Sequence, residues 1–108
     1  MNKKIEVINS FDFDGIINKG EKPILLYFYA KWCTPCKMQE PIVCELYDIL
    51  KDKVDFYKID IDESENLAES LDIKSIPYLM VYFNQEVKEK SIGLTSLAQL
   101  SQMLIKYV

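Results

Sequence analysis

The sequence predicts an α/β protein, a three-layer α/β/α sandwich in which a central mixed sheet is closed by an antiparallel hairpin. Two features of the sequence lead to this prediction. Strand patterns alternate with helix patterns over most of the chain, as in parallel sheets whose strands are joined by helices. Further along, two strand patterns instead follow each other across the tight turn 84–86 (N-Q-E), and a last helix pattern comes after them.

The strands are expected from five short stretches. Residues 23–30 (P-I-L-L-Y-F-Y-A) and 76–83 (I-P-Y-L-M-V-Y-F) are almost continuously apolar and rich in aromatic residues, which indicates central strands covered on both faces. Residues 54–60 have apolar side chains on both alternating faces and also indicate a buried strand. A strand is expected at 5–8, and the polar alternation of 87–92 is typical of an edge strand.

The longest helix pattern covers residues 35–50. Its apolar side chains gather on one face of a helical wheel and its charged ones, among them Lys37 and Glu40, on the opposite face. By the same wheel Cys44 lies on the charged face. The face predicted to meet the sheet consists of Met38, Ile42, Leu46, Ile49 and Leu50.

Three shorter helices complete the pattern. Residues 11–18 (F-D-F-D-G-I-I-N) fit a short first helix, which its glycine weakens. Asp62 and Glu65 have the spacing of a capping box in front of L-A-E-S-L. In the last helix, leucines and a final valine recur at spacings of three and four, with Thr95 or Ser96 as the N-cap.

We expect a single domain over residues 1–108. With 49% hydrophobic and 28% charged residues, the chain has the composition of one globular domain. Its net charge of −4 leaves no basic surface for a phosphate backbone, so nucleic acid is not expected as a partner. No apolar stretch approaches the roughly 20 residues of a membrane span, so no membrane is expected either. The chain is expected to be a monomer.

The compartment is expected to be the cytoplasm. The N-terminal stretch M-N-K-K-I-E-V-I-N-S lacks the apolar run of a signal peptide, because Glu6 and Asn9 interrupt it. Three cysteines are too few, and odd in number, for a disulfide scaffold. In a reducing compartment a C-x-x-C motif is more often redox-active or metal-binding than structural.

The motif W-C-T-P-C-K at 32–37 is the strongest functional signal. Cys33 lies just after an apolar strand and at the opening of the long helix, where the helix dipole should lower its pKa below the roughly 8.5 of a free cysteine. Cys36 is one turn further on, within disulfide reach, and Pro35 costs little in a first helical turn.

Other interpretations of the cysteines remain open at this point. The pair could be an inert crosslink. A zinc site needs four ligands, and with no histidine and only Cys44 in addition, no metal is expected. Cys44 is about 12 Å further along a straight helix than Cys36, too far to bridge, which leaves it incidental or available for an intermolecular or regulatory role.

The chain resembles the thioredoxin family in four places: the strand and W-C-x-P-C-K junction at 24–37, Pro41 within the helix, the Ile76–Pro77 dipeptide, and Gly93 before the last helix. The resemblance implies a thioredoxin fold. It also implies that Pro77 is cis and faces the dithiol, and that the backbone of Ile76 pairs with an extended substrate segment. Trp32 and Gly93 would belong to the same substrate-contacting surface.

The activity that the resemblance implies is reduction of disulfides in partner proteins. Cys33 would attack a disulfide sulfur to form a mixed disulfide, and Cys36 would resolve it. No cofactor is expected in the chain itself. Electrons would come from NADPH through a flavin-dependent thioredoxin reductase, which would be a partner beside the disulfide-containing substrates.

The sequence departs from the family pattern near the motif. Tyr27 stands where thioredoxins carry a buried aspartate that accepts the proton of the resolving cysteine, so water or a nearby carboxylate must serve instead. Lys58 matches the lysine near that aspartate and lacks that partner here. Tyr27 and Lys58 are candidates for tuning the redox potential, although core filling for Tyr27 and a strand lysine that reaches the surface for Lys58 are the favoured interpretations. Between the cysteines, Thr34 replaces the usual glycine. The intervening pair Thr34 and Pro35 should tune the redox potential of the disulfide. Tyr78, where threonine is common, should alter the substrate groove.

Three functions other than disulfide reduction remain open from the sequence. The domain could be a redox-inactive binding or adaptor module on the same fold. It could also be a disulfide oxidase or isomerase with a raised potential. A third alternative is an iron–sulfur scaffold in a dimer.

Overall fold

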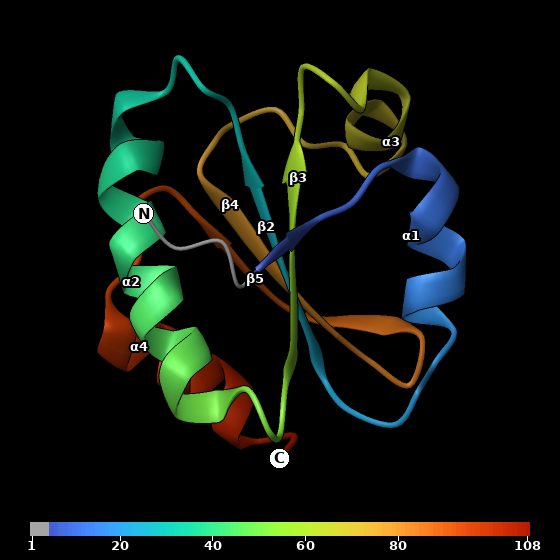
Figure 1. The fold of residues 1–108 in the computed structure, drawn as a ribbon, viewed down its shortest axis with the longest axis vertical. Coiled ribbons are helices and arrows are strands. Elements are labelled where there is room, and N and C mark those ends of the chain that lie inside the picture. Colours follow the sequence, from blue (N-terminus) through green and yellow to red (C-terminus); the bar gives the residue numbers. More distant parts are fainter. Residues whose placement is uncertain (1–4) are drawn as a thin grey trace.

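One five-stranded mixed sheet forms the middle layer of the structure, a computed structural model that describes residues 5–108 (Figure 1). The strand order is β1-β3-β2-β4-β5. The first three strands are mutually parallel, β4 is antiparallel to β2, and β5 is antiparallel to β4. The bounds are β1 (Glu6–Val7), β2 (Ile24–Tyr29), β3 (Asp55–Asp60), β4 (Tyr78–Phe83) and β5 (Glu86–Ile92). The predicted mixed sheet and its closing hairpin are confirmed.

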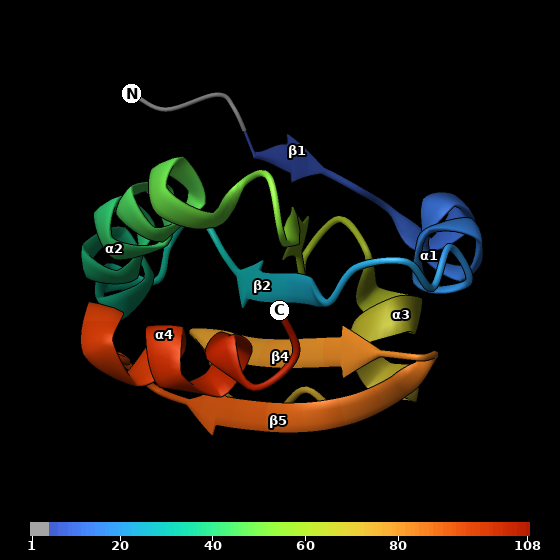
Figure 2. The same ribbon diagram turned by 90° about the horizontal axis from the view of Figure 1, so that it is seen from below.

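Two helices cover each face of the sheet, as Figure 2 shows from below. Helices α2 (Thr34–Leu50) and α4 (Leu97–Ile105) pack on one face, and α1 (Ser10–Ile17) and α3 (Glu65–Ser70) on the other. All four lie where the sequence predicted helices. Within residues 5–108, none of them combines the length and the apolar character that crossing a bilayer requires.

Strand β2 is buried on both faces, which explains its continuous apolar sequence. Leu25 and Tyr27 join the core under α2 and α4, while Leu26 and Phe28 join the core under α1 and α3. The two cores are therefore separated only by the sheet. This central strand leads directly to the C-x-x-C motif.

The hairpin between β4 and β5 turns over two residues. Asn84 and Gln85 both have positive φ, 55° and 65°, the combination of a type I′ turn. Asparagine accepts this conformation more readily than most residues, so the turn is encoded locally.

The helix N-termini agree with the sequence in part. Asn9 caps α1 by accepting from the backbone N–H groups of Phe11 and Asp12, and Ser96 caps α4. The capping box predicted for α3 is wrong: Ser64 is the N-cap and makes no side-chain capping hydrogen bond. The carboxylate of Asp62 instead accepts a hydrogen bond from the Trp32 indole.

Helix α2 is rotated relative to the prediction. Met38 and Ile49, expected in the core, are 57% and 61% exposed. Leu46 is buried and Ile42 and Leu50 pack against the core, as predicted. The buried face also includes Cys36, Gln39, Val43 and Cys44, and its centre lies roughly 90° from the predicted one. The prediction failed because a glutamine and a cysteine occupy core positions that a hydrophobicity pattern assigns to apolar residues.

Candidate active site

Cys33 and Cys36 form a disulfide at the N-terminus of α2. Cys33 is the N-cap residue, with extended backbone, and its Sγ accepts a hydrogen bond from the Cys36 N–H at 3.2 Å. Thr34 and Pro35 form the exposed first turn between them. The N–H groups and the dipole at a helix N-terminus favour negative charge, so reduction would release a stabilised thiolate at Cys33.

The disulfide is packed into a small apolar cluster. Ala30, the residue after β2, is buried with both cysteines, and Tyr29, Ile61 and Ile76 pack against them. Ile76 therefore lies beside the disulfide. Whether its backbone pairs with a substrate stays a prediction.

The segment before β4 lies beside this cluster. The Ile76–Pro77 bond is cis, as predicted. Because Phe28 pairs with Tyr78, Pro77 lies at the end of β2 that leads to the motif. The N–H of Gly93 donates to the Pro77 carbonyl oxygen at 2.8 Å, and Gly93 has φ +90°, a conformation that favours glycine.

The side chain of Tyr78 does not lie on this surface. It is buried in the core under α1 and α3, where its ring meets that of Phe28 edge to face. The predicted effect of Tyr78 on a substrate groove is therefore corrected: the ring has almost no exposed surface to offer a substrate. The alternation of side chains along β4 turns it to the interior.

Trp32 is the exposed aromatic residue of the motif. It is 67% exposed, and its Nε1–H donates to Asp62 Oδ2 at 2.8 Å. The sequence placed Trp32 next to the dithiol without a partner. Asp62, interpreted from sequence as a helix cap, instead holds the indole.

Tyr27 fills the position behind the disulfide. It is buried, and its hydroxyl donates to the Cys36 carbonyl oxygen at 2.8 Å. Burial raises the pKa of Tyr27 far above its ordinary value, and the negative charge of Glu40 raises it further. The phenol is therefore neutral at physiological pH and cannot accept a proton from a thiol.

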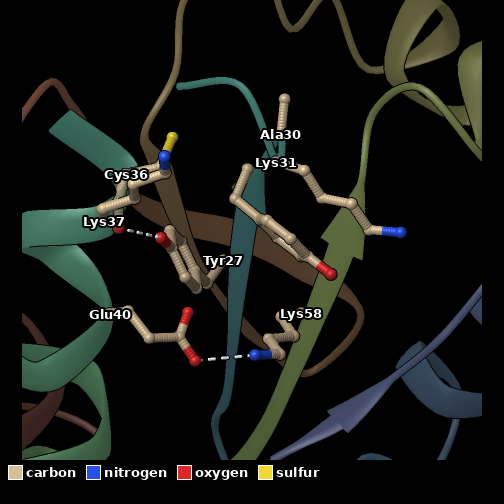
Figure 3. Close-up of a pocket in the computed structure, with 8 residues that line it drawn as sticks. Tyr27, Ala30, Lys31, Cys36, Lys37, Glu40 and Lys58 are labelled. Carbon is tan, nitrogen blue, oxygen red and sulfur yellow. Dashed lines mark hydrogen bonds and ion pairs between the residues drawn. The ribbon is translucent and has the colours of Figure 1, made fainter. Parts of the chain in front are cut away.

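Lys58 has a partner that the sequence analysis did not find. Its Nζ lies 2.6 Å from Glu40 Oε2, and the two side chains are 13% and 26% exposed (Figure 3). The aspartate partner of the family pattern is absent, as predicted, because Tyr27 stands in its place, and Glu40 pairs with Lys58 instead. Glu40 was assigned to the charged, solvent-facing side of the helix, but the rotation of α2 turns it toward β3. The available signal was its position four residues after Cys36, which places both on one side of a helix.

A pocket of about 360 Å³ connects these groups (Figure 3). It reaches from Cys36 at the start of α2 to the ion pair between α2 and β3. Its walls carry three lysines, one carboxylate and two phenols beside the cysteine. The lining residues are Tyr27, Tyr29, Ala30, Lys31, Cys36, Lys37, Glu40 and Lys58.

Cys44 is buried, contrary to its predicted place on the charged face. Burial raises the pKa of its thiol, and the negative charge of Glu40 adds to the effect. Its Sγ lies 3.9 Å from Glu40 Oε2. A buried thiol with a raised pKa is a poor nucleophile, which disfavours an intermolecular role in the folded protein.

Gln39 is a site residue that sequence reasoning missed. It is 0% exposed, and its amide makes two hydrogen bonds to the backbone of Thr95: Nε2–H donates to the carbonyl oxygen at 2.9 Å, and Oε1 accepts from the N–H at 2.8 Å. This amide ties the start of α2 to the segment after Gly93. The only sequence signal was a polar residue three positions after Cys36.

No group of three or more histidine, cysteine or acidic side chains within residues 5–108 is arranged to hold a metal ion. The fold and the disulfide instead define a class: α/β proteins with a Cys-x-x-C pair at a helix N-terminus beside a cis-proline.

Comparison with known proteins identifies the family. The thioredoxin family model matches residues 4–106. Thioredoxin of Rickettsia felis is 39% identical over 87 residues, which cover 81% of this chain and 83% of that protein. Chloroplastic thioredoxin M-type of Pisum sativum is 37% identical over 105 residues, which cover 97% of this chain and 61% of the pea protein. This chain belongs to the thioredoxin family.

Solved structures agree with the fold. Mitochondrial thioredoxin 3 from Saccharomyces cerevisiae, in its oxidized form, superposes with a TM-score of 0.83 at 28% identity, with 94% of each chain covered. Chloroplastic thioredoxin z superposes with a TM-score of 0.87 at 22% identity, which supports the fold alone. The chain spans 56% to 61% of the length of two plant relatives it matches.

Proposed function

We propose that this protein is a thiol–disulfide oxidoreductase that reduces disulfides in partner proteins. One observation carries the proposal: the Cys33–Cys36 disulfide closes the N-terminus of α2, next to a cis-proline and an exposed tryptophan. Family membership supports the same activity. No observation favours a redox-inactive adaptor, an oxidase or an iron–sulfur scaffold.

The reaction begins from the reduced dithiol. The Cys33 thiolate attacks one sulfur of the partner's disulfide, and the other partner sulfur leaves as a thiolate and takes up a proton. The Cys36 thiol then loses its proton and attacks Cys33 Sγ. The mixed disulfide breaks, the partner leaves as its second thiol, and the Cys33–Cys36 disulfide forms. Two electrons have passed from the protein to the partner.

The cycle closes when the disulfide is reduced again. Electrons come from NADPH through a flavin-dependent thioredoxin reductase, and the protein works as a monomer in the cytoplasm. These parts of the proposal rest on the family and on the sequence. The plant relatives are named as chloroplastic, whereas the cytoplasm is proposed for this chain.

The test uses single cysteine variants and insulin as the disulfide substrate. Cys36→Ser leaves the attacking thiol without its resolving partner, so it is expected to trap a mixed disulfide that non-reducing electrophoresis detects. Cys33→Ser is expected to trap none, and Cys44→Ser is the control that keeps full activity. If Cys33→Ser traps the mixed disulfide instead, the roles are reversed. If the parent protein does not accelerate insulin reduction by NADPH and thioredoxin reductase, the proposed activity is wrong.

A further inference from the structure

Resolution of the mixed disulfide requires the Cys36 thiol to lose its proton. Cys36 is buried in the apolar cluster with Ala30 and Cys33, an environment that disfavours a charged thiolate. A proton acceptor within reach would therefore speed this step. Tyr27, directly behind Cys36, is not that acceptor, because its phenol stays protonated and its hydroxyl is engaged with a backbone carbonyl.

The pocket between α2 and β3 offers one carboxylate. Among the residues that line it, Lys31, Lys37 and Lys58 carry positive charge and cannot take up a further proton. Tyr29 is excluded as well, because burial and the charge of Asp60 raise its pKa to about 12. Glu40 is thus the one carboxylate among the lining residues of the described chain.

Glu40 is held where it can serve this pocket. It lies one helical turn beyond Cys36, and Lys58 from β3 fixes one of its carboxylate oxygens. Figure 3 shows the other carboxylate oxygen directed away from Lys58, on the side of Tyr27. The Lys58 ammonium also lies 5.3 Å from the centre of the Tyr29 ring, which limits its freedom to move.

The path from the thiol to this carboxylate crosses the pocket. The Cys36 sulfur points away from Glu40, so the two groups do not touch (Figure 3). The pocket volume of about 360 Å³ has room for several waters, each of which occupies about 30 Å³. Proton transfer through a water molecule satisfies the reach that general-base catalysis needs.

We propose that Glu40, positioned by Lys58, accepts the proton of the Cys36 thiol through water in this pocket during resolution of the mixed disulfide. This inference rests on the proposed function. The proton moves from Cys36 Sγ through water to the Glu40 carboxylate, and the Cys36 thiolate attacks Cys33 Sγ while the partner sulfur leaves with the electron pair of the broken bond. Glu40 then releases the proton to solvent. A carboxylate from helix α2 thereby does the work that the tyrosine on β2 cannot do.

The test separates attack from resolution with 5,5′-dithiobis(2-nitrobenzoate), in a Cys44→Ser background. Reduced protein releases one thionitrobenzoate when Cys33 attacks, at a rate proportional to reagent concentration. It releases the second, independently of reagent concentration, when Cys36 resolves the mixed disulfide. Stopped-flow absorbance from pH 6 to 9 measures both phases. The matched variants are Glu40→Gln and Glu45→Gln, which make the same change on opposite sides of α2, Glu45 being exposed.

Glu40→Gln is expected to slow the second phase about tenfold at pH 7, with the deficit shrinking as hydroxide takes over at higher pH. Its first phase is expected to match the parent, and Glu45→Gln to change neither phase. A second phase in Glu40→Gln with the parental rate and pH profile would overturn the proposal. A parent protein without two phases would instead contradict the proposed dithiol cycle.

A purely structural role of Glu40 is tested by the same profile. Removing the carboxylate leaves Lys58 partly buried without its partner, which costs stability. Glu40→Gln combined with Lys58→Met removes both charges. This double variant replaces the single variant in the kinetic test if Glu40→Gln does not fold. The double variant is expected to show the same slow, pH-dependent second phase. A parental second phase in a folded double variant would rule out the proton-acceptor role.

Discussion

Gln39→Leu is the substitution whose cost the structure defines most closely. Gln39 is completely buried, and both ends of its amide bind the backbone of Thr95. Leucine has a similar volume and fits the apolar surroundings, but it leaves the Thr95 N–H and carbonyl oxygen without these partners. Thr95 is itself buried, so water does not readily replace them.

Each buried polar group left unpaired costs about 1–3 kcal/mol. Two such groups cost about 4 kcal/mol at the middle of that range, and burial of an apolar side chain offsets about 1.5 kcal/mol, so the net loss is about 2–3 kcal/mol. For a domain of this size 1 kcal/mol corresponds to roughly 4–8 °C in Tm, so Gln39→Leu is expected to lower Tm by about 10–20 °C.

Urea unfolding followed by far-UV circular dichroism measures this loss. Gln102→Leu is the matched control, because it makes the same change at an exposed position on α4 and should alter the free energy of unfolding by less than about 0.5 kcal/mol. If Gln39→Leu is as stable as this control, the amide does not hold the segment after Gly93, and the reasoning from hydrogen-bond satisfaction is refuted.

Three further predictions concern single side chains. Because burial raises the pKa of Tyr27, the folded state keeps a proton that the unfolded state loses near pH 10, so the free energy of unfolding falls as pH rises above that value. Tyr27→Phe should remove up to about 1.4 kcal/mol per pH unit of this fall, as measured by urea unfolding at pH 9 and 11. The same fall in the parent and the variant would contradict this prediction. Because burial and the charge of Glu40 raise the pKa of Cys44, iodoacetamide at pH 8 should label Cys44 in the oxidised native protein at least about tenfold more slowly than in the urea-unfolded protein. Mass measurement gives both labelling rates, and similar rates would show that the native thiol is accessible. Asp62→Ala frees the indole of Trp32, so KM for insulin should rise severalfold while the free energy of unfolding changes by less than about 0.5 kcal/mol; an unchanged KM would exclude a role of the held indole in substrate contact.

The elements of the fold were predictable because their signals are local. Continuous apolar stretches identified β2 and β4, and the turn at Asn84 identified the hairpin. The C-x-x-C motif was placed correctly because its position after a buried strand fixes it at a helix N-terminus. Sequence patterns of this kind depend only on neighbours along the chain.

The contacts behind the disulfide were not predictable in the same way. A hydrophobicity pattern cannot foresee that the Gln39 amide is hydrogen-bonded to the backbone of Thr95, which is 56 residues away, so the core face of α2 was misassigned in part. That error carried Cys44 and Glu40 to the wrong side. The Glu40–Lys58 pair joins a helix to a strand, and such tertiary ion pairs produce no periodic pattern in the sequence.

The reduction potential of the Cys33–Cys36 pair tests the central claim most directly. Equilibration of the protein in dithiothreitol redox buffers, followed by alkylation and mass measurement, gives the fraction oxidised at each potential. A disulfide reductase is expected to lie near the roughly −270 mV of thioredoxins. A value of about −180 mV or higher would contradict the account and make the protein an oxidase or isomerase instead.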